Sequence, residues 1–489
     1  MKLVGRHEEI HTLEQITKSG KPEFLAIYGR RRIGKTYLIR QFFLAKRDCI
    51  YFNITGAKDG TRAEQLAHFT TEISRVFYDG MPLVSPKTWD NAFFMLNKVI
   101  EQRPKNKKII LFLDELPWMA TPKSRLLQTL DYYWNHYWSA DQRIKLIICG
   151  SSASWIIKNV INNKGGLHNR VTHKMRLEPF TLSQTKDFLE YNGITLKPPH
   201  ILLLYMVTGG VPYYLAHLKK GLSVAQLIEP IAFTEKGILF DEFNNLFSSL
   251  FDKADNYIAL VKTIANKQYG IGKRELLKTI GKSVLGSVGI KMLDELEEAG
   301  FIMSFTPYQH KRQGVYYRLI DEYTFFYLKW IAPLKNSLQK KGLDKGNWQA
   351  IQRTPEWYNW LGYAFETVCY RHISLIRKSL SLTPDSVASA WRYAPRKGAN
   401  ERGAQIDLLF DRPDDSITLC EIKYSEEPFK ITKDYAYVLQ RKMTVFKEQT
   451  RTKKHLFLAM ITSMGLKESI YSEDMVDGVV TLVDLFKTG

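Results

Sequence analysis

Short apolar runs alternate with amphipathic stretches along the first part of the chain, up to about residue 180. Four of these runs are apolar at nearly every position, which is typical of strands that helices cover on both faces. Strands that alternate with helical stretches predict the parallel sheet of an α/β domain. The predicted strands are Phe24–Tyr28, Cys49–Ile54, Ile109–Asp114 and Lys145–Cys149.

The pattern changes twice further along the chain. From about residue 181 to 250 it is helical, with breaks at Lys197-Pro198-Pro199 and at Gly209-Gly210-Val211-Pro212. Residues 255–320 then predict three helices and two strands around a basic turn, which is the element order of a winged helix. The predicted helices are about 256–267, 273–281 and Ser287–Glu298, and a second α/β region follows them.

Composition narrows the classes of protein to which the chain can belong. Hydrophobic residues make up 45% and charged residues 25% of its 489 positions, as in ordinary soluble globular proteins. No apolar run reaches the roughly 18 residues of a membrane helix, and charges follow Met1 too early for a signal peptide. The four cysteines form no CxxC pair, so neither a zinc site nor a disulfide framework is indicated. We therefore expect a cytoplasmic protein with no membrane partner.

The net charge is +20, from 70 Lys and Arg against 50 Asp and Glu. A surplus of this size favours a polyanionic partner, above all a nucleic acid such as DNA. The alternative is a solvated basic surface that only keeps the protein soluble. Composition thus indicates a class of partner and no particular site.

A glycine-rich motif follows the first predicted strand and precedes an amphipathic helix, which is the context that a P-loop requires. Glycines let such a loop wrap around phosphates, and the backbone N–H groups at the helix start attract them. Lys35 is predicted to reach the β- and γ-phosphates of ATP, and the Thr36 hydroxyl to bind Mg²⁺. The predicted nucleotide-binding residues are Gly29, Arg30, Arg31, Arg32, Ile33, Gly34, Lys35 and Thr36.

Two carboxylates end the third predicted strand. Asp114 is predicted to hold Mg²⁺, directly or through water, opposite Thr36. Glu115 is placed to polarise a water molecule against the γ-phosphate, as a general base does. Ser151 or Ser152, at the end of the next strand, is a candidate sensor of the γ-phosphate, and an ordinary loop serine is the alternative.

These motifs resemble, in order, those of the AAA+-related archaeal-type ATPases. The matching stretches are LVGRHEEIHTLEQI, GRRRIGKTYLIRQF, LFLDELPWM, ICGSSASW, LHNRVTHKMRLEPF and TGGVPYYL. The resemblance implies that the N-terminal helix lies beside the adenine and that Gly209, Gly210 and Pro212 belong to a lid. It also implies that Arg170 is an arginine finger or sensor, although Asn169 replaces the usual glycine before it; a surface arginine is the alternative.

A second set of candidate residues lies in AQIDLLFDRPDDSITLCEIKYS, near the C-terminus. The turn cluster Asp411–Ser416 between two apolar runs predicts a hairpin that places Asp407 opposite Glu421. Glu421 and Lys423 then share a face with apolar residues, where opposed carboxylates repel unless a cation lies between them. The pattern predicts a divalent metal at Asp407 and Glu421, with Lys423 beside it.

This arrangement resembles the PD-(D/E)xK nuclease core, in which the Asp and Glu bind Mg²⁺ and the Lys positions or deprotonates the attacking water. The resemblance implies these roles for Asp407, Glu421 and Lys423, and adds Glu366 on a preceding helix as a metal ligand. Ile406 stands where many members have Pro. Two alternatives stay open: an inactive relative that only binds, and a salt-bridged hairpin edge.

The role of the predicted winged helix also stays open. Its third helix carries Lys291 but also four carboxylates, which would repel the phosphates of DNA. The basic turn could contact a nucleic-acid backbone, or the module could relay the nucleotide state inside the molecule. The four carboxylates are Asp294, Glu295, Glu297 and Glu298, and the basic residues of the turn are His310, Lys311 and Arg312.

The predicted fold class is α/β, with four parts. They are a P-loop ATPase core of the AAA+ type (1–180), a helical lid (181–250), a winged helix (251–325) and a PD-(D/E)xK-like α/β domain (326–489). The predicted function is Mg-ATP hydrolysis coupled to a domain that binds or cleaves nucleic acid. One alternative is a nucleotide-dependent switch whose C-terminal domain only binds a partner. Another is a signalling ATPase that forms an ATP-dependent homo-oligomer through Arg170, as related STAND-type proteins do.

Overall fold

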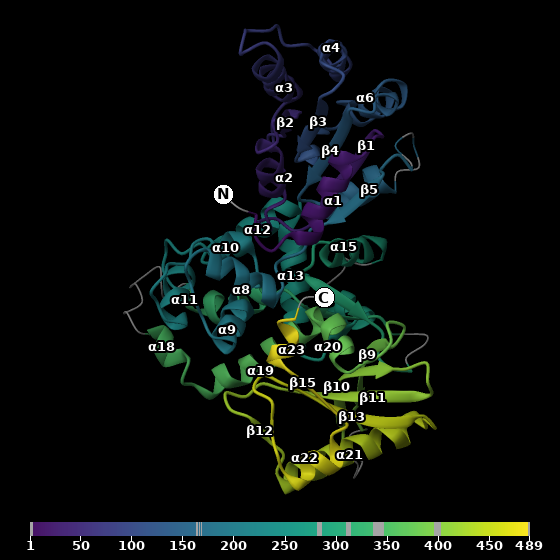
Figure 1. Ribbon diagram of the computed structural model, residues 1–489. Helices are drawn as coiled ribbons and strands as arrows, with labels where there is room; N and C mark the ends of the chain where they lie inside the picture. The colour runs from purple at the N-terminus through teal and green to yellow at the C-terminus, as the bar shows by residue number, and fades with distance from the viewer. Residues whose placement is uncertain are drawn as a thin grey trace. The chain divides into compact units, whose positions relative to one another are not determined.

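The protein divides into two compact units, Met1–Pro179 and Phe180–Gly489, in the computed structural model (Figure 1). The division falls next to the boundary that the sequence predicts at residue 180. The structure describes residues 3–162, 165, 167, 169–280, 286–309, 314–335, 347–395 and 402–487. Within these residues, no helix combines the length and the apolar character that crossing a membrane requires.

A parallel five-stranded sheet of order β2-β3-β4-β1-β5 forms the centre of the first unit. Four of its strands are the predicted ones, and the fifth is short and alternates in burial, so it lacks a continuous apolar run. Because all five strands are parallel, their carboxyl ends meet at one edge of the sheet. The strands are β1 (Glu23–Tyr28), β2 (Cys49–Thr55), β3 (Lys108–Asp114), β4 (Ile144–Gly150) and β5 (His173–Arg176).

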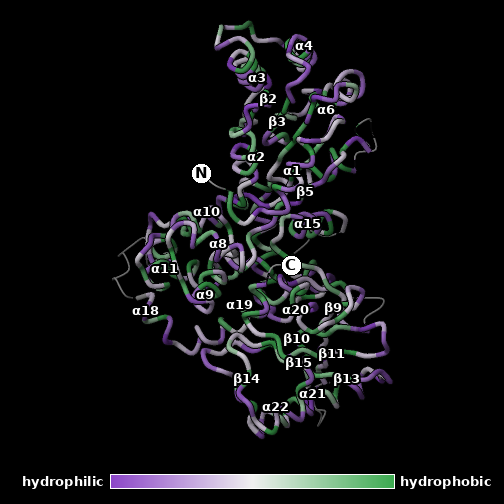
Figure 2. The backbone as a smooth tube through the Cα atoms, viewed as in Figure 1, coloured by the Kyte–Doolittle hydropathy of each residue, from purple (hydrophilic) through white to green (hydrophobic). Residues whose placement is uncertain are grey.

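Helices cover both faces of this sheet, whose strand β3 is among the hydrophobic segments in Figure 2. Apolar residues of α1 and α2 pack on one face, against Leu25, Ile27 and Ile147. Those of α3, α4 and α6 pack on the other face, where the aromatic segment around Trp134 and Trp138 is buried. The helices are α1 (His7–Lys18), α2 (Lys35–Leu44), α3 (Arg62–Phe77), α4 (Trp89–Glu101), α5 (Leu116–Met119), α6 (Leu126–His136), η1 (Trp138–Ala140), α7 (Ala153–Ile156) and η2 (Ile157–Ile161).

The second unit begins with helices only. Its first helix starts with a capping box, in which Thr181 and Gln184 satisfy each other's backbone N–H groups. The next helix starts at Pro198 and ends at Thr208, and the left-handed conformation of the following Gly209 stops it as the sequence predicts. These helices are α8 (Leu182–Tyr191), α9 (Pro198–Thr208), α10 (Pro212–Leu215), α11 (Val224–Ala232) and α12 (Glu242–Leu250).

Three helices and a small antiparallel sheet of order β6-β8-β7 follow. The helices begin and end within two residues of the predicted positions, and β6 is a strand that the sequence did not indicate. The predicted basic turn, His310, Lys311 and Arg312, lies outside the described residues. The elements are α13 (Ala254–Ala265), β6 (Ile271–Gly272), α14 (Lys273–Ile280), α15 (Ser287–Glu298), β7 (Ile302–Phe305) and β8 (Tyr316–Leu319).

A mixed sheet of order β15-β13-β11-β10-β9 ends the chain. Strands β9, β10 and β11 are antiparallel, and β11, β13 and β15 are parallel. The β10–β11 hairpin is the predicted one. The elements from 322 on are α16 (Glu322–Phe326), η4 (Tyr327–Ile331), α18 (Asn347–Ile351), α19 (Pro355–Arg371), α20 (Ile373–Ser379), β9 (Val387–Tyr393), β10 (Ala404–Asp411), β11 (Ser416–Lys423), β12 (Phe429–Lys430), α21 (Lys433–Thr450), β13 (His455–Thr462), β14 (Leu466–Lys467), α22 (Ile470–Met475), β15 (Gly478–Thr481) and α23 (Leu482–Leu485).

Candidate functional site

The P-loop lies between β1 and α2. Gly29 has a φ of 139°, and a side chain there would meet the Leu177 carbonyl oxygen at 2.3 Å, so only glycine fits. Gly34 is left-handed and precedes α2, which begins at Lys35. Lys35 is buried, and its Nζ donates hydrogen bonds of 2.8 Å to the carbonyls of Gly29 and Arg30. The loop thus holds its own ammonium group at the N-terminal end of a helix, where phosphates bind readily.

Asp114 ends β3 and is only 1% exposed. The Thr36 hydroxyl donates to both of its oxygens, at 3.1 Å to Oδ1 and 2.9 Å to Oδ2. Thr55 at the end of β2 donates to Oδ2 at 3.2 Å, and the Cys149 thiol on β4 also hydrogen-bonds the carboxylate. Burial and the neighbouring Glu115 raise the pKa of Asp114. The two side chains predicted to bind Mg²⁺ are therefore in direct contact, and their oxygens are of the type that Mg²⁺ prefers.

Glu115 has the left-handed backbone angles φ 48° and ψ 47°, which cost a residue with a side chain free energy. Its carboxylate accepts two hydrogen bonds from Ser151, one from the backbone N–H at 2.9 Å and one from the hydroxyl. The Ser152 hydroxyl lies instead 3.4 Å from that of Ser154. Of the two candidate sensors, Ser151 is the one that contacts the predicted general base.

Arg6, the residue before α1, connects the N-terminal segment to the P-loop. This side chain is buried, and its Nη2 donates to the Ile33 carbonyl at 3.1 Å. Its Nη1 donates to Glu9 Oε1, also at 3.1 Å. Burial lowers the pKa of Arg6, while Glu9 acts in the opposite direction. Among the remaining loop residues, Arg30 and Ile33 are buried, and Arg31 and Arg32 are partly exposed.

Arg170 is exposed in the turn before β5, where its backbone N–H donates to the Leu167 carbonyl at 3.2 Å. The preceding Asn169 has a φ of 57°. Asparagine is one of the few residues besides glycine that adopt this conformation readily, so Asn169 meets the backbone requirement at the position where the family has glycine. The role of Arg170 as a finger or sensor stays a prediction.

Four predicted residues of the second unit come together from three elements. Glu366 lies on α19, Asp407 on β10, and Glu421 and Lys423 on β11. The hairpin register places Asp407 opposite Glu421, as predicted. Lys423 Nζ lies 3.1 Å from Glu421 Oε1. We refer to these four residues as the carboxylate set.

Helix α21 adds two side chains that the sequence did not indicate. The Tyr435 hydroxyl donates to Glu421 Oε1 at 2.7 Å, and Lys442 Nζ donates to Oε2 at 2.6 Å. Within β10, Gln405 Nε2 donates to Asp407 Oδ1 at 3.2 Å. Both oxygens of Glu421 are therefore held by donors from other elements.

The electrostatics of the carboxylate set are uneven. Burial, and after it Asp407, raises the pKa of Glu366 to about 8. Burial and Glu421 raise the pKa of Asp407. Burial also opposes ionisation of Glu421, but Lys442 and Lys423 outweigh it and hold the pKa of this carboxyl below its usual value. Negative charge is thus neutralised at Glu421 and crowded at the other two carboxylates, where a cation would relieve it.

Oxygen donors of this kind fit Mg²⁺. Within the described residues, however, no group of three His, Cys, Asp or Glu side chains is arranged so that it could hold a metal ion. In addition, Lys423 and Lys442 already contact the two oxygens of Glu421. The metal-binding role of Glu366, Asp407 and Glu421 therefore stays a prediction.

Several side chains of both sites were not predicted from the sequence, although a weak sequence feature accompanies each of them. Thr55 and Cys149 lie at or near the carboxyl ends of predicted strands, as Asp114 does. Tyr435 and Lys442 are seven residues apart and so lie on one face of a helix. These signals become specific only once the order of strands and the packing of α21 are known.

A five-stranded parallel sheet, with a glycine loop after β1 and the Thr36–Asp114 contact at its carboxyl edge, defines a P-loop ATPase domain. Residues 3–218 match a family model described as "ATPase domain predominantly from Archaea". This match supports an archaeal-type ATPase and, in general terms, ATP hydrolysis. It extends beyond the first unit, through α10.

The chain is similar to several known proteins and solved structures. An uncharacterized protein of Methanocaldococcus jannaschii is 25% identical over 430 residues, which are 86% of this chain and 88% of that protein. The Walker-type ATPase of Pyrococcus abyssi has a TM-score of 0.48 and 17% identity, over 67% of this chain and 96% of that one. The ORC2 protein of Aeropyrum pernix, in its ADPNP and ADP complexes, has a TM-score of 0.43 and 14% identity, over 69% and 95%.

Proposed function

We propose that the chain hydrolyses Mg-ATP in its first unit and uses the nucleotide state to control a nuclease-like domain that binds or cleaves nucleic acid, DNA in the first place. The proposed parts are the ATPase core (1–180), the lid (181–250), the winged helix (251–325) and the PD-(D/E)xK-like domain (326–489). The observation that carries the proposal is the carboxylate set, which brings three acids and a lysine together from α19, β10 and β11.

In the ATPase core, Lys35 would leave the carbonyls of Gly29 and Arg30 for the phosphates of ATP. Thr36 and Asp114 would hold Mg²⁺, which neutralises phosphate charge when it is bound. Glu115 would take the proton of the attacking water, and Ser151 orients its carboxylate. The neighbouring Ser152 would sense the γ-phosphate.

In the C-terminal domain, Asp407, Glu421 and Glu366 would hold Mg²⁺, and the bound ion would stabilise the charge on a phosphodiester. Lys423 would orient the attacking water or move its proton, because its ammonium group lies within hydrogen-bonding distance of Glu421. The basic net charge of the chain suits a polyanionic substrate.

For the winged helix we favour the internal role over contact of α15 with DNA. Two of the carboxylates on this helix are used within the module itself. Glu295 accepts a hydrogen bond from the Tyr257 hydroxyl, and Glu297 accepts one from the Ser304 backbone N–H at 2.6 Å. Their charge would also repel phosphates from this helix.

The test is cleavage of plasmid and single-stranded DNA with Mg²⁺ or Mn²⁺, with and without ATP. The wild type is compared with Glu421→Gln, with the exposed Glu427→Gln as a matched control, and with Lys35→Ala. We expect the wild type and Glu427→Gln to cleave DNA and Glu421→Gln not to. In Lys35→Ala, cleavage should no longer depend on ATP. Cleavage that survives Glu421→Gln would remove the carboxylate set from the chemistry.

A second candidate is a nucleotide switch whose C-terminal domain only binds. The contacts of Lys442 and Tyr435 favour it, since they hold Glu421 at both oxygens. ATP hydrolysis without cleavage under any condition would support this reading. Light scattering with a slowly hydrolysed ATP analogue, on the wild type and on Arg170→Ala, tests whether the switch forms a homo-oligomer through the exposed Arg170.

A further inference from the structure

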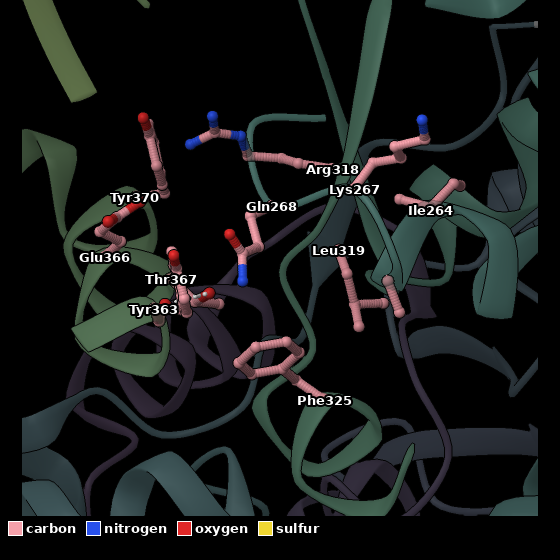
Figure 3. Close-up of a pocket in the computed structure, with 11 residues that line it drawn as sticks. Ile264, Lys267, Gln268, Arg318, Leu319, Phe325, Tyr363, Glu366, Thr367 and Tyr370 are labelled. Atoms are coloured by element: carbon pink, nitrogen blue, oxygen red, sulfur yellow. Dashed lines mark hydrogen bonds between the residues drawn. The ribbon is translucent and has the colours of Figure 1, made fainter. Parts of the chain in front are cut away.

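A cavity adjoins the carboxylate set within the second unit (Figure 3). Its empty volume, open solvent included, is about 410 Å³, and residues of α13, β8, α16 and α19 line it. Glu366 and Tyr370 form the α19 wall, and Arg318 of β8 and Gln268 face them. The Tyr370 hydroxyl also donates to the Asp407 carbonyl. The cavity and the carboxylate set therefore share α19 as a common wall.

Arg318 is the most unusual residue of this cavity, because it is a cation that is only 6% exposed. Its guanidinium carbon lies 3.7 Å from the centre of the Tyr370 ring and 4.6 Å from that of Phe305. A guanidinium has five N–H donors, and in the described part of the chain Arg318 gives one of them, from Nη2 to the Tyr269 carbonyl at 3.1 Å. Its buried Nε has no hydrogen-bond partner among the described residues.

Stacking alone could account for a buried arginine, since aromatic faces attract cations. It does not satisfy the N–H donors, however, because these lie in the plane of the guanidinium and not above it. Figure 3 shows the guanidinium of Arg318 extending from β8 towards Tyr370 and Glu366 on the opposite wall. Two planar rings that fix a guanidinium, with most of its donors left unused, prepare it for a forked contact with an anion such as phosphate.

We propose that this cavity binds a phosphate group of a nucleic-acid strand, with Arg318 as the residue that holds the anion. This inference rests on the proposed function, because a nucleic-acid substrate is what would bring a phosphodiester beside the carboxylate set. The winged-helix part would then contribute to the substrate site through β8, and not through the acidic helix α15. Gln268, exposed at the rim of the cavity, would lie beside the nucleic-acid strand.

The experiment measures binding of a fluorescent single-stranded 12-nucleotide DNA, with a 5′-phosphate or a 5′-hydroxyl, in EDTA so that nothing is cleaved. All proteins carry Lys35→Ala, which removes the P-loop as a phosphate site. Arg318→Gln removes the proposed contact, and Gln268→Glu places a negative charge at the exposed rim, where folding is not at risk. The matched control is Arg377→Gln, because Arg377 also stacks on an aromatic ring, that of Phe410, but does not line the cavity.

We expect Arg318→Gln and Gln268→Glu to bind the DNA about tenfold more weakly, since hydrogen bonds to a charged group are among the strong ones. Arg318→Gln should also reduce the slope of log Kd against log salt by about 0.7, the amount for one lost phosphate contact on a single strand. A purely structural arginine would leave this slope unchanged. A larger loss for the 5′-phosphate DNA would assign the cavity to a strand end, and an equal loss to an internal phosphodiester.

The outcomes separate the two proposals. If the Lys35→Ala parent protein binds DNA and both variants match it in affinity and salt slope, the cavity inference is overturned and the proposed function stands. If no protein binds DNA but inorganic phosphate stabilises the folded protein through Arg318, the nucleic-acid function fails and the cavity takes free phosphate instead.

Discussion

The hydrogen bond from Arg6 to the Ile33 carbonyl should help to hold the P-loop in the conformation that receives ATP. Arg6→Met keeps the apolar stem of this buried side chain and removes its hydrogen bonds to Ile33 and Glu9. A hydrogen bond that involves a charged group contributes about 1.5–3 kcal/mol. The second bond, to Glu9, adds less, because Glu9 is 17% exposed at its side chain and water can replace the arginine.

Without Arg6, the P-loop would have to become ordered when ATP binds. The free energy of the lost hydrogen bonds would then be subtracted from the free energy of ATP binding. At about 1.4 kcal/mol per tenfold, the loss corresponds to a Kd for ATP that is about 10- to 150-fold higher. The assay is titration with a fluorescent ATP analogue and Mg²⁺, with the thermal unfolding of each variant as a check of folding. Glu9→Gln is the control, since it leaves the Arg6–Ile33 bond intact, and its affinity should stay within about threefold of wild type.

Two results would refute this reasoning. A folded Arg6→Met protein whose ATP affinity stays within about threefold of wild type would show that the loop is ordered without Arg6. An equal loss in Glu9→Gln would assign the effect to the ion pair and not to the contact with the loop.

Three further predictions concern the second unit. Burial lowers the pKa of His372 from 6.5 to about 4, so its contribution to stability is present above pH 6.5 and is lost as the pH falls towards 4, by about 3 kcal/mol; calorimetry should show a weaker pH dependence of Tm in His372→Gln. Arg371→Met removes the cation 2.9 Å from the buried Glu322 and should cost about 3–5 kcal/mol, which the double variant with Glu322→Gln should largely recover in urea unfolding. Gly210→Ala would place a Cβ 2.3 Å from the Phe180 carbonyl oxygen at a φ of 64°, so it should lower Tm by several degrees, whereas Gly20→Ala, with open space around it, should not.

The first unit was largely predictable because most of its strands are continuous apolar runs in the sequence. A parallel strand that is buried on both faces must be apolar at nearly every position, and β1, β3 and β4 meet this rule. Sequence does not give the order of strands in the sheet, which sets the neighbours of each strand end. The contact of Thr55 with Asp114 depends on β2 lying next to β3, so it could not be derived before the structure.

In the carboxylate set, too, contacts between residues close in the sequence were predictable and contacts between distant residues were not. A short turn fixes the register of its hairpin, so the placement of Asp407 opposite Glu421 follows from counting outward from Asp414. Lys442 reaches Glu421 from 21 residues away, through the packing of α21 on the sheet. The facing carboxylates predicted a divalent metal at Asp407 and Glu421, and this stays a prediction; the contact of Lys442 with Glu421 was not predicted.

Helix α19 connects the parts of the second unit within a few residues of its C-terminal end. Tyr370 donates to the Asp407 carbonyl on β10, Arg371 donates to the carbonyl before α16 at 3.0 Å, and His372 accepts a hydrogen bond from the Leu182 backbone N–H at the start of α8. Because a packed interior does not deform continuously, a shift of α8 must move α19 or break this last contact. If α8 moves as part of a lid, the movement would therefore be transmitted to Asp407 through less than one turn of helix. His372→Gln should accordingly weaken the effect of ATP on nucleic-acid binding while ATP hydrolysis continues, and an unchanged effect of ATP would exclude α19 as the route.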